Sequence, residues 1–254
     1  MIVLKSKKEL ELMRRAGQIN AQVLQIIREA VRPGVTTAEL NVVAEQAQAK
    51  FGVTPVFKGY TFGSKKPPFP TTITACVNEE LVHGIPGKRY LQEGDLLSVD
   101  CASRYEGYIG DSAFSMVVGS SSPEIDDLLA VTERALYVGI EQCHSGNRVG
   151  DVAAAIQRYV EANGFNVVRG YGGHGVGRTM HEEPHVPNHG EPGKGALLRP
   201  GMTFAIEPMV LQGDHQVVTL SDQWTVVAKD RMLTAHFEHT VAITDNGPEI
   251  LTSL

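Results

Sequence analysis

Apolar residues recur every three or four positions in four stretches of the chain, which predicts four amphipathic helices. The first helix begins at the capping box Ser6–Glu9 and ends before Pro33-Gly34. The second begins at a similar box, Thr36–Glu39, and stops at Gly52. Because only a short break separates them, these two helices form a pair.

The same order of elements returns in the middle of the chain. Ser122-Pro123 opens a third helix that is expected to end near Ser145-Gly146. A fourth helix is expected from about Val149 to Asn163, before Gly164-Phe165. Each helix pair therefore leads into sequence of a different kind.

That sequence consists of β-type runs. They are predicted at Leu96 to Tyr105, Tyr108 to Val118, Met202 to Leu211, Gln216 to Leu220, Trp224 to Ala228 and Ala235 to Thr244. Two helix–helix–strand units, about residues 6–119 and 120–254, predict one α+β domain with pseudo-twofold symmetry. Its curved antiparallel sheet would carry both helix pairs on one face. The alternative is that the repeat is coincidental.

The segment from Val53 to Thr74 breaks this regularity. It contains Pro55, Pro67, Pro68 and Pro70 together with three glycines. Such a composition predicts a long loop that serves as a lid or as the wall of a pocket.

Composition narrows the class of protein. The chain has 254 residues, 42% apolar content and a net charge of −6, so it can bury a sizeable core and offers no basic surface for nucleic acid. No apolar run is long enough for a membrane span, and the N-terminus has no signal-peptide core. The three scattered cysteines are typical of a reduced, cytoplasmic protein.

The stretch GYGGHGVGRTMHEEPH, from Gly170 to His185, fits two known patterns by accident. As G-x-G-x-x-G it lacks the helix that must open at the last glycine. As H-E-x-x-H it contains Pro184, which disfavours the helix that would align His181 with His185. We therefore expect an irregular, glycine-rich loop that presents imidazoles.

Two aspartates in the β-type runs are candidate metal ligands. With a turn centred between Arg104 and Gly107, Asp100 and Asp111 are direct cross-strand neighbours on one face. Like charges in that position are unfavourable unless a cation lies between them. The alternative is a solvated turn edge.

Glu207 and Glu238 lie in equally apolar strands, where a lone carboxylate is expensive to bury unless a salt bridge pairs it. With the two aspartates they carry four negative charges, which two divalent cations would balance. An imidazole from the glycine-rich loop would complete a mixed oxygen and nitrogen set that suits Mn, Fe, Co or Zn. Bridged metals of this kind are typical of a hydrolytic site.

Taken together, the residues Asp100, Asp111, His174, Glu207 and Glu238, with VHGIPG, GGHGVG, HEEP, PGMTFAIEPM and EHTVAIT around them, resemble type I methionine aminopeptidases, of peptidase family M24. The resemblance covers nearly the whole chain. It implies the pita-bread (creatinase/aminopeptidase) fold and two divalent metal ions (Co, Mn, Fe, Zn or Ni). It also implies removal of the initiator methionine from nascent polypeptide N-termini when the next residue is small. The short spacing between His174 and Glu207 and the short N-terminus match the bacterial or organellar form.

The resemblance assigns roles to single residues. Asp100 and Asp111 would bind one metal, and Asp111, His174, Glu207 and Glu238 the other. Glu207 would also move the proton, His181 would stabilise the oxyanion, and His83 would contact the scissile nitrogen. The other histidines have no match in the family and are expected on the surface or around the site; they are His144, His185, His189, His215, His236 and His239.

One departure concerns the pocket for the methionine side chain. A longer stretch, TFGSKKPPFPTTITAC, follows Gly59-Tyr60, and the cysteine usual in that pocket cannot be placed on Cys76. Tyr60, Met180 and Trp224 are the candidate pocket residues, although Trp224 fits strand packing equally well.

Composition therefore leads us to expect a cytoplasmic protein without nucleic-acid or membrane partners. We further expect a monomer that acts on nascent N-termini, with the ribosome as a candidate partner. Two alternatives stay open: a proline-directed aminopeptidase or prolidase of the same fold, and a non-catalytic binding module. Comparing the cleavage of Met-Xaa and Xaa-Pro peptides distinguishes the first alternative from a methionine aminopeptidase. Elemental analysis for bound metal tests the second.

Overall fold

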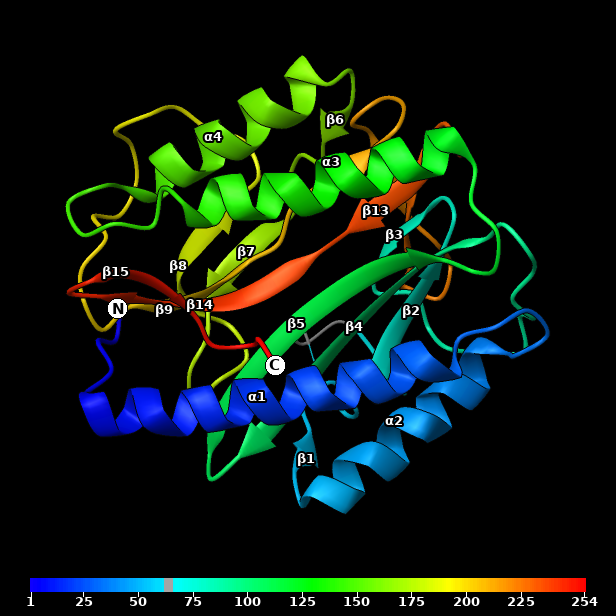
Figure 1. Ribbon diagram of the computed structural model, residues 1–254, viewed down its shortest axis with the longest axis horizontal. Helices are drawn as coiled ribbons and strands as arrows, with labels where there is room; N and C mark the ends of the chain where they lie inside the picture. Colours follow the sequence, from blue (N-terminus) through cyan, green and yellow to red (C-terminus); the bar gives the residue numbers. More distant parts are fainter. Residues whose placement is uncertain (62–65) are drawn as a thin grey trace.

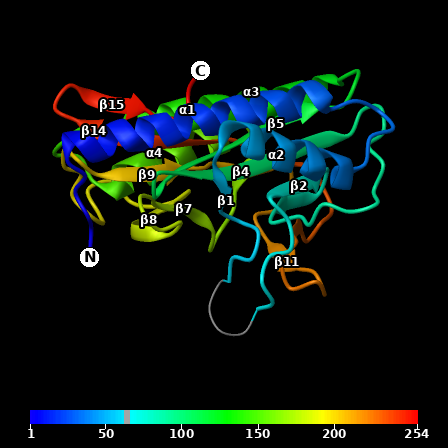
Figure 2. The same cartoon turned by 90° about the horizontal axis from the view of Figure 1, so that it is seen from below.

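The computed structural model describes residues 1–61 and 66–254, and its four helices lie on one face of a curled antiparallel sheet (Figures 1 and 2). They are α1 (Lys7–Ala30), α2 (Thr37–Phe51), α3 (Pro123–Ile140) and α4 (Val149–Ala162). The small sheet formed by residues 80–82, 217–219 and 226–228, together with residues 53–61 and 66–74, lies on the other face (Figure 2). None of the described helices is both long and apolar enough to cross a bilayer.

The predicted helix ends are largely confirmed. At the helix starts, side chains bond to backbone N–H groups that have no partner within the helix. Ser6 and Glu9 form the expected reciprocal capping box, and Gly52 ends α2 in a left-handed conformation with φ of 67°. Helix α3 ends at Ile140, earlier than predicted. There the chain tightens into a turn in which Cys143 N–H donates to the Ile140 carbonyl.

The main sheet joins the strands of the two halves of the chain. Its order is β1-β4-β5-β14-β9-β7-β8, with β2 and β15 attached to β4 and β14. Two small sheets, β13-β10-β6 and β11-β12-β3, flank it. The strands are β1 (Thr54–Pro55), β2 (Ile73–Val77), β3 (Glu80–Val82), β4 (Leu96–Tyr105), β5 (Tyr108–Val117), β6 (Asn166–Val167), β7 (Gly172–Gly175), β8 (Glu182–Pro187), β9 (Thr203–Ile206), β10 (Met209–Leu211), β11 (Val217–Thr219), β12 (Val226–Ala228), β13 (Thr234–His236), β14 (Glu238–Thr244) and β15 (Gly247–Ile250).

Each half places a helix pair before strands of the main sheet, and the halves meet where β5 pairs with β14. Two helix pairs cover the sheet, as expected (Figure 1). That the halves arose as repeats of one unit stays a prediction.

Two runs that were each predicted as one strand are divided into two strands in the structure. The run from Met202 to Leu211 divides into β9 and β10, which belong to different sheets. The break falls at Glu207-Pro208, where proline has no N–H to donate to a ladder. The run from Ala235 divides into β13 and β14 around Phe237. Both glutamates of interest therefore lie where the chain passes from one sheet to another.

The predicted register of the β4–β5 hairpin is wrong, because the centre of the turn lies one residue later than predicted. Tyr105 pairs with Tyr108, so the turn consists of Glu106 and Gly107, both with positive φ. Asp100 consequently lies opposite Ala113, and Asp111 opposite Ala102. The aspartates are diagonal rather than direct neighbours, but they stay on the same face because the pairing shifts by two residues.

The glycine-rich stretch is also more regular than predicted. Instead of an irregular loop, it forms β7 and β8, which pair so that His174 faces His185. The absence of a helix between His181 and His185 is confirmed. Only residues 176–181, between the two strands, form a loop.

Helix α1 approaches the sheet most closely at two glycines. A Cβ atom on Gly110 of β5 would lie 2.5 Å from Gly17 Cα of α1. The absence of side chains at this crossing allows the helix to pack directly on β5, one residue from Asp111.

Candidate metal centre

A cavity of about 420 Å³ lies between strands of the main sheet and the described parts of the 53–74 segment. These parts lie on the face of the sheet turned away from the helices (Figure 2). All ten candidate site residues line it: Tyr60, His83, Asp100, Asp111, His174, Met180, His181, Glu207, Trp224 and Glu238. Its lining contains both the carboxylates and imidazoles and a group of apolar side chains. The two kinds of residue were predicted separately, and the fold brings them into one space.

Three ligand groups already have the spacing of a metal site. One donor atom each from Asp111, His174 and Glu238 lies within 4.8 Å of the other two, and all three residues are buried. Asp111 comes from β5, His174 from β7 and Glu238 from β14. Asp111 is held in place by Thr240 of β14, whose hydroxyl accepts from the Asp111 N–H at 3.1 Å and donates to its carbonyl at 2.8 Å.

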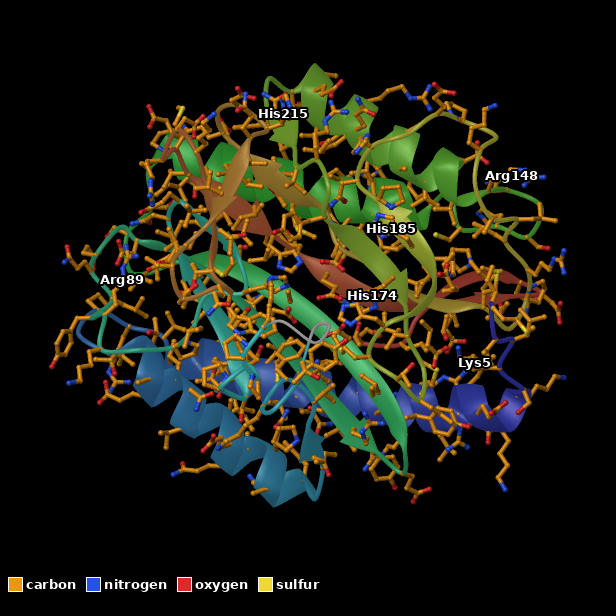
Figure 3. The ribbon with its side chains drawn as sticks, turned by 180° about the vertical axis from the view of Figure 1, so that it is seen from behind. Lys5, Arg89, Arg148, His174, His185 and His215 are labelled. Carbon is orange, nitrogen blue, oxygen red and sulfur yellow. The ribbon has the colours of Figure 1, made fainter. Side chains whose placement is uncertain are left out.

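The orientation of His174 fits a ligand role. Its Nδ1 lies 3.0 Å from the Gly175 carbonyl, which leaves Nε2 facing the carboxylates. Nε2 lies 3.7 Å from Asp111 Oδ2 and 3.7 Å from Glu207 Oε1. Figure 3 shows His174 near the centre of this face, with His185 on the neighbouring strand.

The carboxylates are short of partners. Asp100 Oδ1 and Asp111 Oδ1 are buried and have no hydrogen-bond partner in the described structure. Burial, reinforced by the neighbouring carboxylates, raises the pKa of Asp100, Asp111 and Glu238 well above the usual range. Orphaned oxygens and mutual repulsion are what bound cations would relieve, so the residues fit a metal centre.

Glu207 has different surroundings because three imidazoles face it. Burial alone would raise its pKa, but His236, His174 and His181 together lower it. His236 Nε2 lies 3.6 Å from Glu207 Oε2, beyond hydrogen-bond length, and the His236 side chain is buried. His236 thus lies around the site, within the prediction made for it, although its contact with Glu207 was not foreseen.

His83 and His181 face the carboxylates from other sides of the cavity. Burial lowers the pKa of His83 to about 4, and burial together with the nearby His174 lowers that of His181 to about 3. Tyr60 Oη lies 2.6 Å from His181 Nδ1, and the His181 ring centre is 4.1 Å from that of His174. Both histidines are therefore neutral near pH 7 and can offer an N–H donor.

Aromatic residues form the apolar part of the cavity. Trp224 Nε1 donates to the Pro67 carbonyl at 3.1 Å, and Phe69 packs edge-on against Trp224 with ring centres 5.1 Å apart. Met180 and Tyr60 complete the wall. The described residues of the 53–74 segment thus line a pocket as predicted, and residues 62–65 lie outside the described structure.

Several lining residues were not predicted. Phe57, Lys66, Phe69 and Tyr171 also line the cavity, as does His185, which was expected on the surface or around the site. The first three belong to the irregular segment, where no periodicity indicates which side chains face inward. Cys76 is not among the lining residues: its Sγ accepts from the Gly84 N–H at 3.2 Å, while Thr74 of the same strand lines the cavity.

The fold and the site together define a metal-dependent peptidase, and comparison with known proteins supports this class. Residues 11–245 match metallopeptidase family M24, and the chain belongs to that family. Over 252 residues it is 48% identical to a methionine aminopeptidase of Clostridium perfringens, with 99% of each chain covered.

Solved structures agree with this assignment. The crystal structure of methionine aminopeptidase from Thermotoga maritima superposes with a TM-score of 0.95 at 44% identity, covering 100% of both chains. The expected pita-bread fold is thereby confirmed. The prolidase from Pyrococcus furiosus, at 21% identity and a TM-score of 0.80, covers 99% of this chain and 66% of its own, and shares the fold alone.

Proposed function

We propose that this protein is a metal-dependent methionine aminopeptidase that removes the initiator methionine from new polypeptides. The observation that carries the proposal is one cavity that combines buried carboxylates and His174 with an apolar wall. The full-length similarity to methionine aminopeptidases supports the same activity. A prolidase activity is disfavoured because the similarity to prolidases extends only to the fold.

Two divalent cations would be held by the five candidate ligands. Asp100 and Asp111 would hold one, and Asp111, His174, Glu207 and Glu238 the other, with four carboxylates balancing four positive charges. When bound, the metals supply an activated water and polarise the scissile carbonyl. The identity of the metal among Co, Mn, Fe, Zn and Ni depends on availability as well as on the ligands.

The protein's own residues then direct the reaction. Glu207 takes the proton of the attacking water and passes it to the leaving amine. His181, neutral at the mouth of the cavity, donates to the developing oxyanion. His83 contacts the nitrogen of the scissile bond. Tyr60, Met180 and Trp224 bind the methionine side chain in the apolar part, and a small next residue fits beside it.

The expected setting is a cytoplasmic monomer that acts on nascent N-termini, with the ribosome as a candidate partner. Size-exclusion chromatography with light scattering tests the first part. Co-sedimentation of the protein with ribosomes tests the second.

The activity is tested with Met-Ala-Ser and an Xaa-Pro peptide, using protein stripped of metal and then titrated with each candidate ion. Glu207→Gln should lower kcat by at least about 100-fold, because general-base catalysis contributes 10²–10⁴-fold. Glu191→Gln, at an exposed position, is the control and should match the unmodified protein. Preference for the Xaa-Pro peptide, or an active Glu207→Gln variant, would contradict the proposal.

A further inference from the structure

The loop of residues 176–181 carries two cavity residues, Met180 and His181, outside the ladder of strands β7 and β8. Strand pairing therefore does not fix their side chains. Their positions depend on the contacts that hold the loop, among them the hydrogen bond of Tyr60 to His181 and the bonds that the Glu182 carboxylate accepts from the loop backbone.

Glu182 binds the loop with one oxygen and the N-terminal segment with the other. Its Oε1 accepts from the backbone N–H groups of Arg178 at 2.9 Å and Thr179 at 3.2 Å. Its Oε2 accepts from Lys5 Nζ at 2.6 Å. The Glu182 carboxylate thus links the loop that carries His181 to Lys5, which lies 177 positions earlier in the chain.

Lys5 is itself fixed in place. Its backbone N–H donates to the Gly201 carbonyl at 2.7 Å, and only 3% of its side chain is exposed. A Cβ atom on Gly177 would lie 2.7 Å from Lys5 Cε and 2.6 Å from Glu182 Oε1. The ion pair therefore packs directly against the start of the loop. Figure 3 shows Lys5 on the N-terminal segment.

The loop is also tied to the hairpin that carries the aspartates. The Ile109 N–H donates to the Gly177 carbonyl at 2.9 Å, and Arg104 Nη1 donates to the Arg178 carbonyl at 2.6 Å. Ile109 lies two residues before Asp111 on β5. The Ile109 and Arg104 contacts thus hold one side of the loop against the hairpin that carries Asp111, while Glu182 and Lys5 hold the loop from the N-terminal segment.

The Lys5 side chain is buried and that of Glu182 is 12% exposed. Such an ion pair is weak evidence for stability, because desolvation offsets the attraction of the charges. The pair is therefore better explained by the geometry that it imposes than by added stability. A displacement of about 1 Å in a catalytic group can cost 10²-fold in rate. The pair is placed to prevent such a displacement of His181.

We infer that Lys5 and Glu182 are positioning residues for the aminopeptidase reaction, which hold His181 and Met180 at the mouth of the cavity. This inference rests on the proposed function for its kinetic part. The order of the loop itself can be measured independently of activity, because Arg178 provides a trypsin site within it.

The test compares Lys5→Met and Glu182→Gln with Arg14→Met. The control removes another ion pair that ties the first helix to a distant strand, Arg14 with Glu249 at 2.6 Å, whose side chains are 37% and 35% exposed. Lys5→Met and Glu182→Gln should lower kcat on Met-Ala-Ser by about 10- to 100-fold, with little change in KM. Tryptic cleavage after Arg178 should become faster in both, and in the control neither quantity should change.

Coupling to His181 separates positioning from a general loss of structure. In a His181→Ala background, Lys5→Met should lower kcat no further, because His181, the catalytic group of the two that the pair positions, is gone. A full additional loss in that background, or unchanged kcat and unchanged Arg178 cleavage in both single variants, would overturn the inference. An unmodified protein without activity on Met-Ala-Ser would refute the proposed function, while the cleavage rates would still decide the order of the loop.

Discussion

Single residues in apolar strands carried the information about the site. Asp111, Glu207 and Glu238 could be found because each is a carboxylate surrounded by residues that are normally buried. His236 could not be connected with Glu207 in this way. It lies beside the break at Phe237, and its contact depends on how two sheets meet. A residue whose importance is local can be predicted, whereas one that depends on the meeting of distant segments cannot.

The contact between Tyr60 and His181 predicts a kinetic effect. Tyr60→Phe removes a hydroxyl 2.6 Å from His181 Nδ1 and leaves the ring in the apolar wall. Because a hydrogen bond of this kind contributes about 1 kcal/mol, kcat on Met-Ala-Ser should fall roughly 3- to 10-fold. Tyr90→Phe, at a position 65% exposed, is the control. Equal kcat values for the two variants would contradict a role for the Tyr60 hydroxyl.

Because its three cysteines are buried, we expect the protein to resist alkylation. All three are buried, burial raises the pKa of their thiols, and Thr74 rather than a cysteine lines the cavity. Since the thiolate is the reactive form, N-ethylmaleimide should leave turnover of the native protein unchanged. Mass spectrometry of the treated protein provides the check. Inactivation together with labelling of Cys76 would show that the strand opens to solvent.

At the scale of elements, the helix caps could be predicted from the sequence, but the pairing of the strands could not. Capping boxes at Ser6 and Thr36 act over three residues, so the sequence alone locates the helix starts. The register of the β4–β5 hairpin depends on which two residues form the turn. The turn is Glu106-Gly107, and its centre lies one residue later than predicted, so every residue of β4 has a different partner on β5. The division of the second strand at Phe237 depends on tertiary contacts in the same way, whereas Pro208 offers a local signal for the first division.

The capping box of α1 predicts a pH dependence of stability. Hydrogen bonds from the Ser6 backbone and the Tyr108 hydroxyl lower the pKa of Glu9 from 4.5 to about 2. A lowered folded-state pKa gives stability that is complete above about pH 4.5 and is lost as pH falls towards 2. Glu9→Gln should therefore reduce the free energy of unfolding at pH 7 but not at pH 2. Urea unfolding across this range measures the difference, and a constant difference would contradict the assignment.

The crossing of α1 over β5 predicts a large steric effect. Gly110→Ala would place a Cβ atom 2.5 Å from Gly17 Cα, between two backbones that cannot both stay in place. Overpacking of this kind costs about 1–3 kcal/mol or more. Gly87→Ala, where the nearest atom would lie 3.8 Å away, is the matched control. Thermal unfolding of both variants tests this, and equal stabilities would show that the helix can shift freely.

At the scale of the whole molecule, the candidate metals would join the two halves of the chain. Asp100 and Asp111 come from the first half, and His174, Glu207 and Glu238 from the second. The general architecture could be anticipated from four helix patterns, their repetition and the family resemblance. The two small sheets could not, because strands of two or three residues leave too short a pattern to indicate their partners.

Removal of metal should therefore destabilise the whole molecule. A ligand present at 100 times its dissociation constant contributes about 2.7 kcal/mol to the folded state. Chelation should lower Tm, and the addition of Mn²⁺ or Co²⁺ should restore it in proportion to the logarithm of the concentration. Asp111→Asn, which removes a charge from the centre of the site, should respond much less. A Tm of the unmodified protein that is indifferent to chelation would exclude a structural contribution of the metals.

The pairing of β5 with β14 has a consequence for the time at which the candidate metal centre can form during synthesis. Asp100 and Asp111 are made early, but Glu238 is the last of the five candidate ligands to be made and lies on the strand that joins the two halves of the sheet. A partly synthesised chain can offer only an incomplete set of donors. If the candidate ligands hold the metals, the complete set of donors would form only after β14 has docked, and a chain truncated before this strand would keep its remaining carboxylates without the partners that this strand supplies.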